Sequence, residues 1–125
     1  MTSFILIFLG SGLGGTCRHL VTQMTATLAY FPYGTFLANV TGSLIIGLLT
    51  PLLSKMSLPL SSHAQALLIT GFCGSYTTFS TFSLNTIELL ESGQILLGIT
   101  NIILNLSLCL LACMSGLYLG RHWTV

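Results

Sequence analysis

A run of small, hydroxyl-bearing and aromatic residues near the middle of the chain has the strongest chemical character in the sequence. The run reads Gly71-Phe72-Cys73-Gly74-Ser75-Tyr76-Thr77-Thr78-Phe79-Ser80-Thr81-Phe82-Ser83, with six Ser or Thr residues after Gly74. Hydroxyl groups donate hydrogen bonds, and the positively polarised edge of a phenyl ring can face an anion. These residue types, mixed at this density, suit contact with a small anion.

The chain around this run is apolar enough to lie in a membrane. Of 125 residues, 53% are hydrophobic and 4% charged, whereas about a quarter of the residues of an average soluble domain are charged. At membrane depth, a glycine-broken and hydroxyl-rich segment persists only where protein or a water-filled cavity satisfies its polar groups. We therefore expect the function to lie at this segment.

Four apolar stretches must position the run, at residues of about 4 to 26, 35 to 53, 63 to 90 and 94 to 120. Each has close to the length of about 20 residues that a membrane-spanning helix needs, and the run falls in the third. The sequence predicts an all-α integral membrane protein, a single four-helix transmembrane domain over residues 1–125 with its third helix broken. No basic residue precedes Phe4, so we expect the first helix to be retained rather than cleaved as a signal peptide.

The charges give only a weak orientation signal. Four crossings place both termini and the Lys55 connection on one side, where Lys55 and Arg121 favour one orientation and Arg18 partly opposes it. Such a chain can insert both ways. Since four short helices also make a thin wall for a pathway, we expect an antiparallel, dual-topology homodimer in the lipid bilayer, and no nucleic-acid partner.

Small residues mark expected helix contacts, because helices in lipid associate by close packing. Gly10 and Gly14 are four residues apart in the first stretch, as are Ser43 and Gly47 in the second and Gly116 and Gly120 in the last. The four cysteines, which have no zinc-like spacing, are interpreted as small apolar packing residues.

Two of the polar residues inside the apolar stretches can each be interpreted in two ways. Arg18 can extend to the nearer interface along its aliphatic stem or line an aqueous vestibule. Asn39 can form a structural hydrogen bond between helices or contact an anion. In the last stretch, Asn101, Asn105 and Cys109 share one helix face, which should meet a helix or a water-filled crevice.

These residues carry a resemblance to the Fluc/CrcB fluoride channel family. The run from Gly71 to Phe82 is similar to the family signature G-F-x-G-x-x-T-T-F-S-T-F. The segment from Gly34 to Ser43 resembles the second-helix pattern G-T-x-x-x-N-x-x-G-S, and Gly12-x-x-Gly15-x-x-Arg18 resembles the first-helix glycine and arginine pattern. The three motifs occur in the family's order.

The resemblance implies a passive, fluoride-selective channel of the bacterial cytoplasmic (inner) membrane, multi-pass, with two pores per antiparallel dimer. It also implies roles for single residues. Fluoride would pass Asn39, Phe79, Ser80, Thr81, Phe82 and Asn105, with Arg18 at the vestibule; the backbone carbonyls of Gly74 and Thr77 would hold a structural sodium ion. One departure is Asn85, where the family usually has a glutamate.

Other function classes fit less well. A proton-coupled multidrug transporter, also short and four-helical, needs a carboxylate deep in the membrane, whereas Glu88 and Glu91 come at the end of the third stretch. A non-transporting subunit would not need a costly hydroxyl-rich break. We expect no enzyme, because His19, His63 and His122 lack Cys, Asp or Glu neighbours spaced for a metal or nucleophile site.

Overall fold

The computed structural model describes residues 1–28 and 30–123, and all regular structure in these residues is helical. Helix α1 comprises Thr2–Thr25 and α2 comprises Tyr33–Ser54. A segmented column follows, made of α3 (Leu60–Ala64), the π-helix η1 (Gln65–Cys73), α4 (Gly74–Tyr76) and α5 (Phe79–Glu91). Helix α6, Ile95–His122, completes the bundle.

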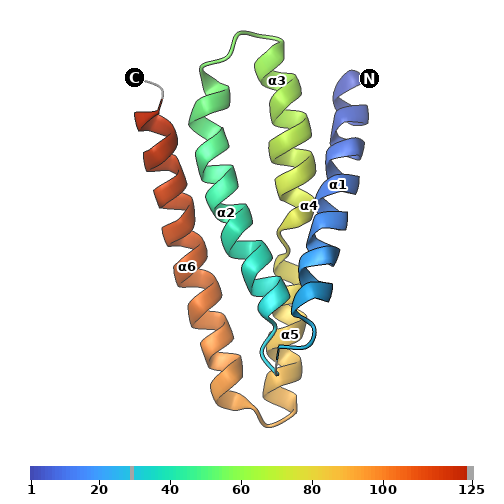
Figure 1. The fold of residues 1–125 in the computed structure, drawn as a ribbon, viewed down its shortest axis with the longest axis vertical. Helices are drawn as coiled ribbons and strands as arrows, with labels where there is room; N and C mark the ends of the chain where they lie inside the picture. Colours follow the sequence, from blue (N-terminus) through green and yellow to red (C-terminus); the bar gives the residue numbers. More distant parts are fainter. Residues whose placement is uncertain (29, 124–125) are drawn as a thin grey trace.

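The helices lie roughly side by side in an elongated bundle (Figure 1). Both termini and the α2–α3 connection lie at one end, and the α1–α2 and α5–α6 connections lie at the other. Helices α3 and α4 occupy the half nearer the termini, and α5 continues the column toward the other end. The break between α4 and α5 therefore lies at mid-height.

Among the described residues, α1, α2 and α6 are long and apolar enough to cross a membrane by length and composition. Their bounds agree with the expected first, second and fourth stretches to within about two residues. The third expected stretch is helical as well, but it is divided into segments that are each too short to qualify. The prediction of an all-helical, multi-pass membrane protein is confirmed at this level.

Glycines set the closest approaches between helices. A β-carbon on Gly47 would collide with the carbonyl oxygen of Cys113, and one on Gly116 would collide with the carbonyl oxygen of Leu44. The α2 and α6 backbones thus touch directly, and this is the most extensive helix contact in the chain. Because dispersion contacts replace hydrophobic exclusion in lipid, such close packing holds α2 and α6 in register.

Close packing at glycines also joins α1 to η1. A β-carbon on Gly10 would overlap the carbonyl oxygen of Leu67, and one on Gly14 would overlap that of Phe72. Both glycines of the predicted first-helix pair therefore lie at a helix contact. This contact fixes the column just before the central run of hydroxyl-bearing residues.

Candidate functional site

The helix break lies at Thr77 and Thr78, whose backbones are extended. Thr77 has φ −83° and ψ 155°, and Thr78 has φ −154° and ψ 115°. The break that the resemblance assigned to Gly74 and Thr77 lies at the Thr77 end, because Gly74 has helical angles of −61° and −32°. Helix α5 then restarts with Thr78 as its N-cap, since Thr81 N–H donates to Thr78 Oγ1 at 3.2 Å.

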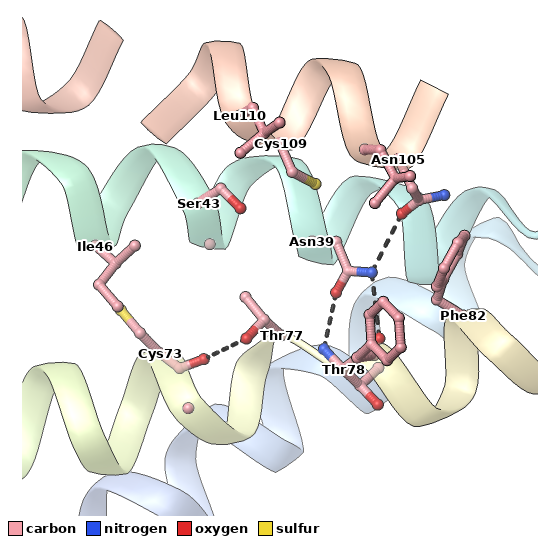
Figure 2. Close-up of a pocket in the computed structure, with 14 residues that line it drawn as sticks. Asn39, Ser43, Ile46, Cys73, Thr77, Thr78, Phe82, Asn105, Cys109 and Leu110 are labelled. Atoms are coloured by element: carbon pink, nitrogen blue, oxygen red, sulfur yellow. Dashed lines mark hydrogen bonds between the residues drawn. The ribbon is translucent and has the colours of Figure 1, made fainter. Parts of the chain in front are cut away.

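Asn39 on α2 takes over the backbone hydrogen bonds of Thr78. The N–H of Thr78 donates to Asn39 Oδ1 at 2.8 Å, and Asn39 Nδ2 donates to the Thr78 carbonyl oxygen at 3.2 Å (Figure 2). The second amide hydrogen of Asn39 goes to Asn105 Oδ1 on α6, also at 3.2 Å. A primary amide has two hydrogens, so both are engaged, and Asn39 joins three elements of the bundle.

At the break, the N–H groups that would donate to the carbonyls of Gly74 and Thr77 in a continuous helix donate elsewhere. In an uninterrupted α-helix, Gly74 C=O would accept from Thr78 N–H and Thr77 C=O from Thr81 N–H. Here Thr78 N–H donates to Asn39 and Thr81 N–H donates to the Thr78 hydroxyl. The carbonyls of Gly74 and Thr77 are oxygen ligands of the kind that hard cations prefer.

A cavity of about 340 Å³ opens beside the break. Asn39, Asn105 and Thr78 gather at the end next to Phe82, and Ile46 and Cys73 lie toward the other end (Figure 2). Six of the predicted site residues line this cavity: Asn39, Gly74, Thr77, Phe79, Phe82 and Asn105. They come from α2, the broken column and α6, which are distant in sequence.

The two phenylalanines are neighbours with different environments. Their ring centroids are 5.3 Å apart, with planes inclined at 52°. Phe82 is 7% exposed, whereas Phe79 is 72% exposed. Phe82 is thus fixed within the chain, while Phe79 presents its ring at the cavity's outer side, where a second chain or lipid can meet it.

The remaining predicted site residues lie outside this cavity. Ser80 is exposed, and its hydroxyl lies 3.2 Å from Thr78 Oγ1. Thr81 is half-buried and lines a second cavity of about 250 Å³, together with Thr35 and Asn85. Arg18 is half-buried on α1 and is not among the residues lining either cavity.

Thr81 has a hydroxyl hydrogen available for a further contact. Thr78 Oγ1 donates to Thr81 Oγ1 at 3.1 Å, and a hydroxyl has one hydrogen to give. Ser80 must therefore donate in its own contact with Thr78, and Thr81 acts as the acceptor of this cluster. The hydrogen of the Thr81 hydroxyl is left for another partner.

Three polar residues with clear structural roles were not predicted as site residues: Thr78, Asn101 and Thr86. Thr78 supplies the extended backbone that Asn39 binds, although it lay within the central run. Asn101 and Thr86 are 1% and 6% exposed and hydrogen-bond to each other at 2.9 Å. The spacing of Asn101 from Asn105 placed both on one helix face, but no sequence pattern pairs Asn101 with Thr86 on another helix.

The cysteines pack inside or beside the bundle, and two of them border the cavity. All four are unpaired thiols; Cys73 is buried and the other three are half-buried. Cys73 and Cys109 line the cavity beside the break. Their packing role agrees with the sequence interpretation, while their position at the cavity was not predicted.

Comparison with known proteins places this sequence in a family. A sequence model described as CrcB-like protein, Camphor Resistance (CrcB), matches residues 5–117. Proteins named fluoride-specific ion channel FluC are similar over nearly their whole length. The protein of Flavobacterium psychrophilum is 42% identical over 98% of this chain and 99% of its own, and that of Clostridium perfringens is 44% identical over 94% and 92%. These relatives are named as channels and not as enzymes, and the chain belongs to the CrcB-like family.

Proposed function

We propose that this protein is a passive, fluoride-selective channel that lets fluoride leave the cytoplasm down its electrochemical gradient. Hydrogen fluoride crosses membranes as a neutral molecule and dissociates in a more alkaline compartment, where the anion is trapped. An anion pore lets the membrane potential drive fluoride out without another energy source. The protein would act in the bacterial cytoplasmic membrane.

One observation carries the proposal most directly: a break in an apolar helix brings the Asn39 amide and the rings of Phe79 and Phe82 to one cavity, with Thr81 at a second. Fluoride is small and strongly hydrated, so a pathway must replace its water with several donors. Thr81 has a hydroxyl hydrogen to give, and Ser80 lies beside it. Conduction also needs binding weak enough for the ion to leave, which the ring edges of Phe79 and Phe82 supply.

Asn39 can contact fluoride only by exchanging a bond. Both amide hydrogens are engaged with Thr78 and Asn105, so an anion at the cavity would compete with one of these acceptors. Fluoride, as an ionised acceptor, forms a stronger hydrogen bond than a neutral carbonyl oxygen, which favours the exchange. If the ion takes the place of the Thr78 carbonyl, the bond to Asn105 is kept, and Asn105 orients the amide of Asn39.

The path we propose has two parts. Fluoride enters through the second cavity, past Thr81, and then passes the rings of Phe82 and Phe79 to the cavity of Asn39. Arg18, half-buried on α1, would raise the anion concentration at the vestibule. The exposed ring of Phe79 suggests that a second copy of the chain, inserted in the opposite orientation, completes each of two pores.

We further propose that sodium binds at the break as a structural ion. The Gly74 and Thr77 carbonyls fit a hard cation, since their usual helical donors bond elsewhere. One chain provides two such oxygens, so the antiparallel partner would provide a matching pair. When bound, sodium would supply a positive charge near the anion path and would link the two breaks.

Flux from liposomes tests the function. Purified protein is reconstituted into vesicles loaded with potassium fluoride or potassium chloride, and efflux is followed with ion-selective electrodes after valinomycin is added. We expect rapid fluoride efflux and little chloride efflux. Equal efflux of both anions would contradict selectivity, and proton-coupled efflux of organic cations would instead identify a multidrug transporter.

A further inference from the structure

We infer that Thr86 and Asn101 are positioning residues for Asn39, acting through a directed chain of hydrogen bonds. The chain starts at the Phe82 carbonyl and ends at the N–H of Thr78. It crosses from α5 to α6, then to α2, and finally to the helix break. The hydrogen-bond chain itself does not depend on the proposed function. Only the role of Asn39 as a residue that contacts fluoride rests on it.

Each link in the chain has ordinary hydrogen-bond length. Thr86 Oγ1 donates to the Phe82 carbonyl at 2.8 Å, and Asn101 Nδ2 donates to Thr86 Oγ1 at 2.9 Å. Asn105 Nδ2 donates to Asn101 Oδ1 at 2.8 Å and to the Asn101 carbonyl at 3.1 Å. Asn39 Nδ2 donates to Asn105 Oδ1 at 3.2 Å.

The direction of the chain follows from its two ends. The N–H of Thr78 can only donate, so the oxygen of the Asn39 amide must face it. The nitrogen of Asn39 then faces Asn105, which must present its own oxygen. The nitrogen of Asn105 therefore points to Asn101, whose backbone carbonyl can only accept.

The far end imposes the same direction. With its side-chain oxygen facing Asn105, Asn101 must turn its nitrogen toward Thr86. The Thr86 hydroxyl accepts that bond and has to give its hydrogen elsewhere. The Phe82 carbonyl, an obligate acceptor, receives it at 2.8 Å. Every amide orientation is thus fixed between one backbone donor, the Thr78 N–H, and three backbone acceptors, the carbonyls of Thr78, Asn101 and Phe82.

Burial makes this orientation costly to change. Asn101, Asn105 and Thr86 are 1%, 4% and 6% exposed, so water has little access to replace a lost link. Among the described residues, no buried side-chain nitrogen or oxygen lacks a partner. Turning one amide over would set donor against donor at the next link, and the mismatch would pass along the chain to Asn39.

The substitution Thr86→Val tests the inference, with Thr86→Ser as the conservative variant. Valine has nearly the shape of threonine but cannot accept from Asn101 or donate to Phe82, whereas serine keeps the hydroxyl. We expect Thr86→Val to lower fluoride efflux about tenfold, by analogy with the lower end of the loss when a group that orients a metal-binding residue is removed. The fluoride-to-chloride efflux ratio should also fall, and Thr86→Ser should restore both.

The ratio separates positioning from a merely structural role. A variant that only unfolds part of the sample lowers both effluxes together and leaves their ratio unchanged. Thr50→Val is the matched control, because Thr50 also donates to the carbonyl four residues earlier, at 2.7 Å, but is exposed on α2. It should leave efflux, ratio and thermal midpoint close to those of the unmodified protein.

Thermal denaturation of purified variants tests the chain without using flux. Thr86→Val should lower the midpoint in the unmodified protein and lower it less in an Asn39→Ala background, because members of one hydrogen-bond network are coupled. Equal decreases in the two backgrounds, or an unchanged efflux ratio in Thr86→Val, would overturn the inference. If the midpoint decreases are coupled but the protein transports no fluoride, the proposed function is overturned and the hydrogen-bond chain is retained.

Discussion

Thr35 Oγ1 donates a hydrogen bond of 3.0 Å to Asn85 Oδ1, joining the first turn of α2 to the middle of α5. Asn85 also lines two neighbouring cavities at the end of the bundle away from the termini. The resemblance to the fluoride channel family implies a glutamate at this position. Asparagine offers an acceptor oxygen to Thr35 without a negative charge, while Glu88 lines one of the two cavities.

Thr35→Val should destabilise the protein by about 1 kcal/mol, the usual net effect of losing one hydrogen bond. Thr35 is 6% exposed, so water cannot easily take the place of its hydroxyl at Asn85. Thr35→Ser keeps the donor and should retain most of the stability. Denaturant unfolding in detergent measures both, and equal stability of the valine variant and the unmodified protein would contradict a role for this bond.

Gly116→Ala should weaken the contact between α2 and α6. The added methyl group would meet the Leu44 carbonyl oxygen and, at 2.8 Å, the Leu48 nitrogen, so the helices must separate at a cost of about 1–3 kcal/mol. Gly12→Ala is the matched control in α1, since nothing lies within 4 Å of its added methyl group.

Alanine at position 12 should leave stability unchanged or raise it by up to about 1 kcal/mol through helix propensity. Thermal denaturation of both variants in the same detergent provides the comparison. Similar midpoints for the two variants would show that the close approach at Gly116 does not limit stability.

The sequence was sufficient for the helices and for six of the residues that line the cavity, because their signals are local. Apolar length gave the bounds of α1, α2 and α6, and the central run contained the broken segment. Of the two residues at which the helix breaks within this run, Thr77 was predicted and Thr78 was not. Gly74 is the obvious helix-weakening residue, yet its backbone is helical; the break occurs at Thr78 because Asn39, distant in sequence, binds its backbone groups.

The hydrogen-bond chain could not be predicted for a related reason. The helix face shared by Asn101 and Asn105 follows from spacing alone, but the partner of Asn101 depends on the register between α5 and α6. Thr86 had no distinguishing mark among many Ser and Thr residues. Pairing across helices is a tertiary property, which a single sequence does not encode in any local pattern.

Sodium should stabilise the purified protein if the carbonyls of Gly74 and Thr77 hold it. A ligand at about 100 times its dissociation constant adds about 2.7 kcal/mol to a folded state that binds it. We expect the thermal midpoint to rise with sodium chloride and not with N-methylglucamine chloride at the same ionic strength. A midpoint that depends only on ionic strength would contradict a sodium site.

Phe79→Ile should lower fluoride efflux while leaving the fold of the chain intact. The ring of Phe79 is 72% exposed and borders the cavity, so its replacement removes few contacts within the chain. Loss of about 1 kcal/mol of ring-edge attraction corresponds to about fivefold slower passage. Phe8→Ile is the matched control, since Phe8 is 77% exposed on α1 and is not among the residues lining the cavity. Efflux from liposomes containing equal amounts of protein compares the two; if both variants conduct fluoride equally fast, the ring of Phe79 has no part in the path.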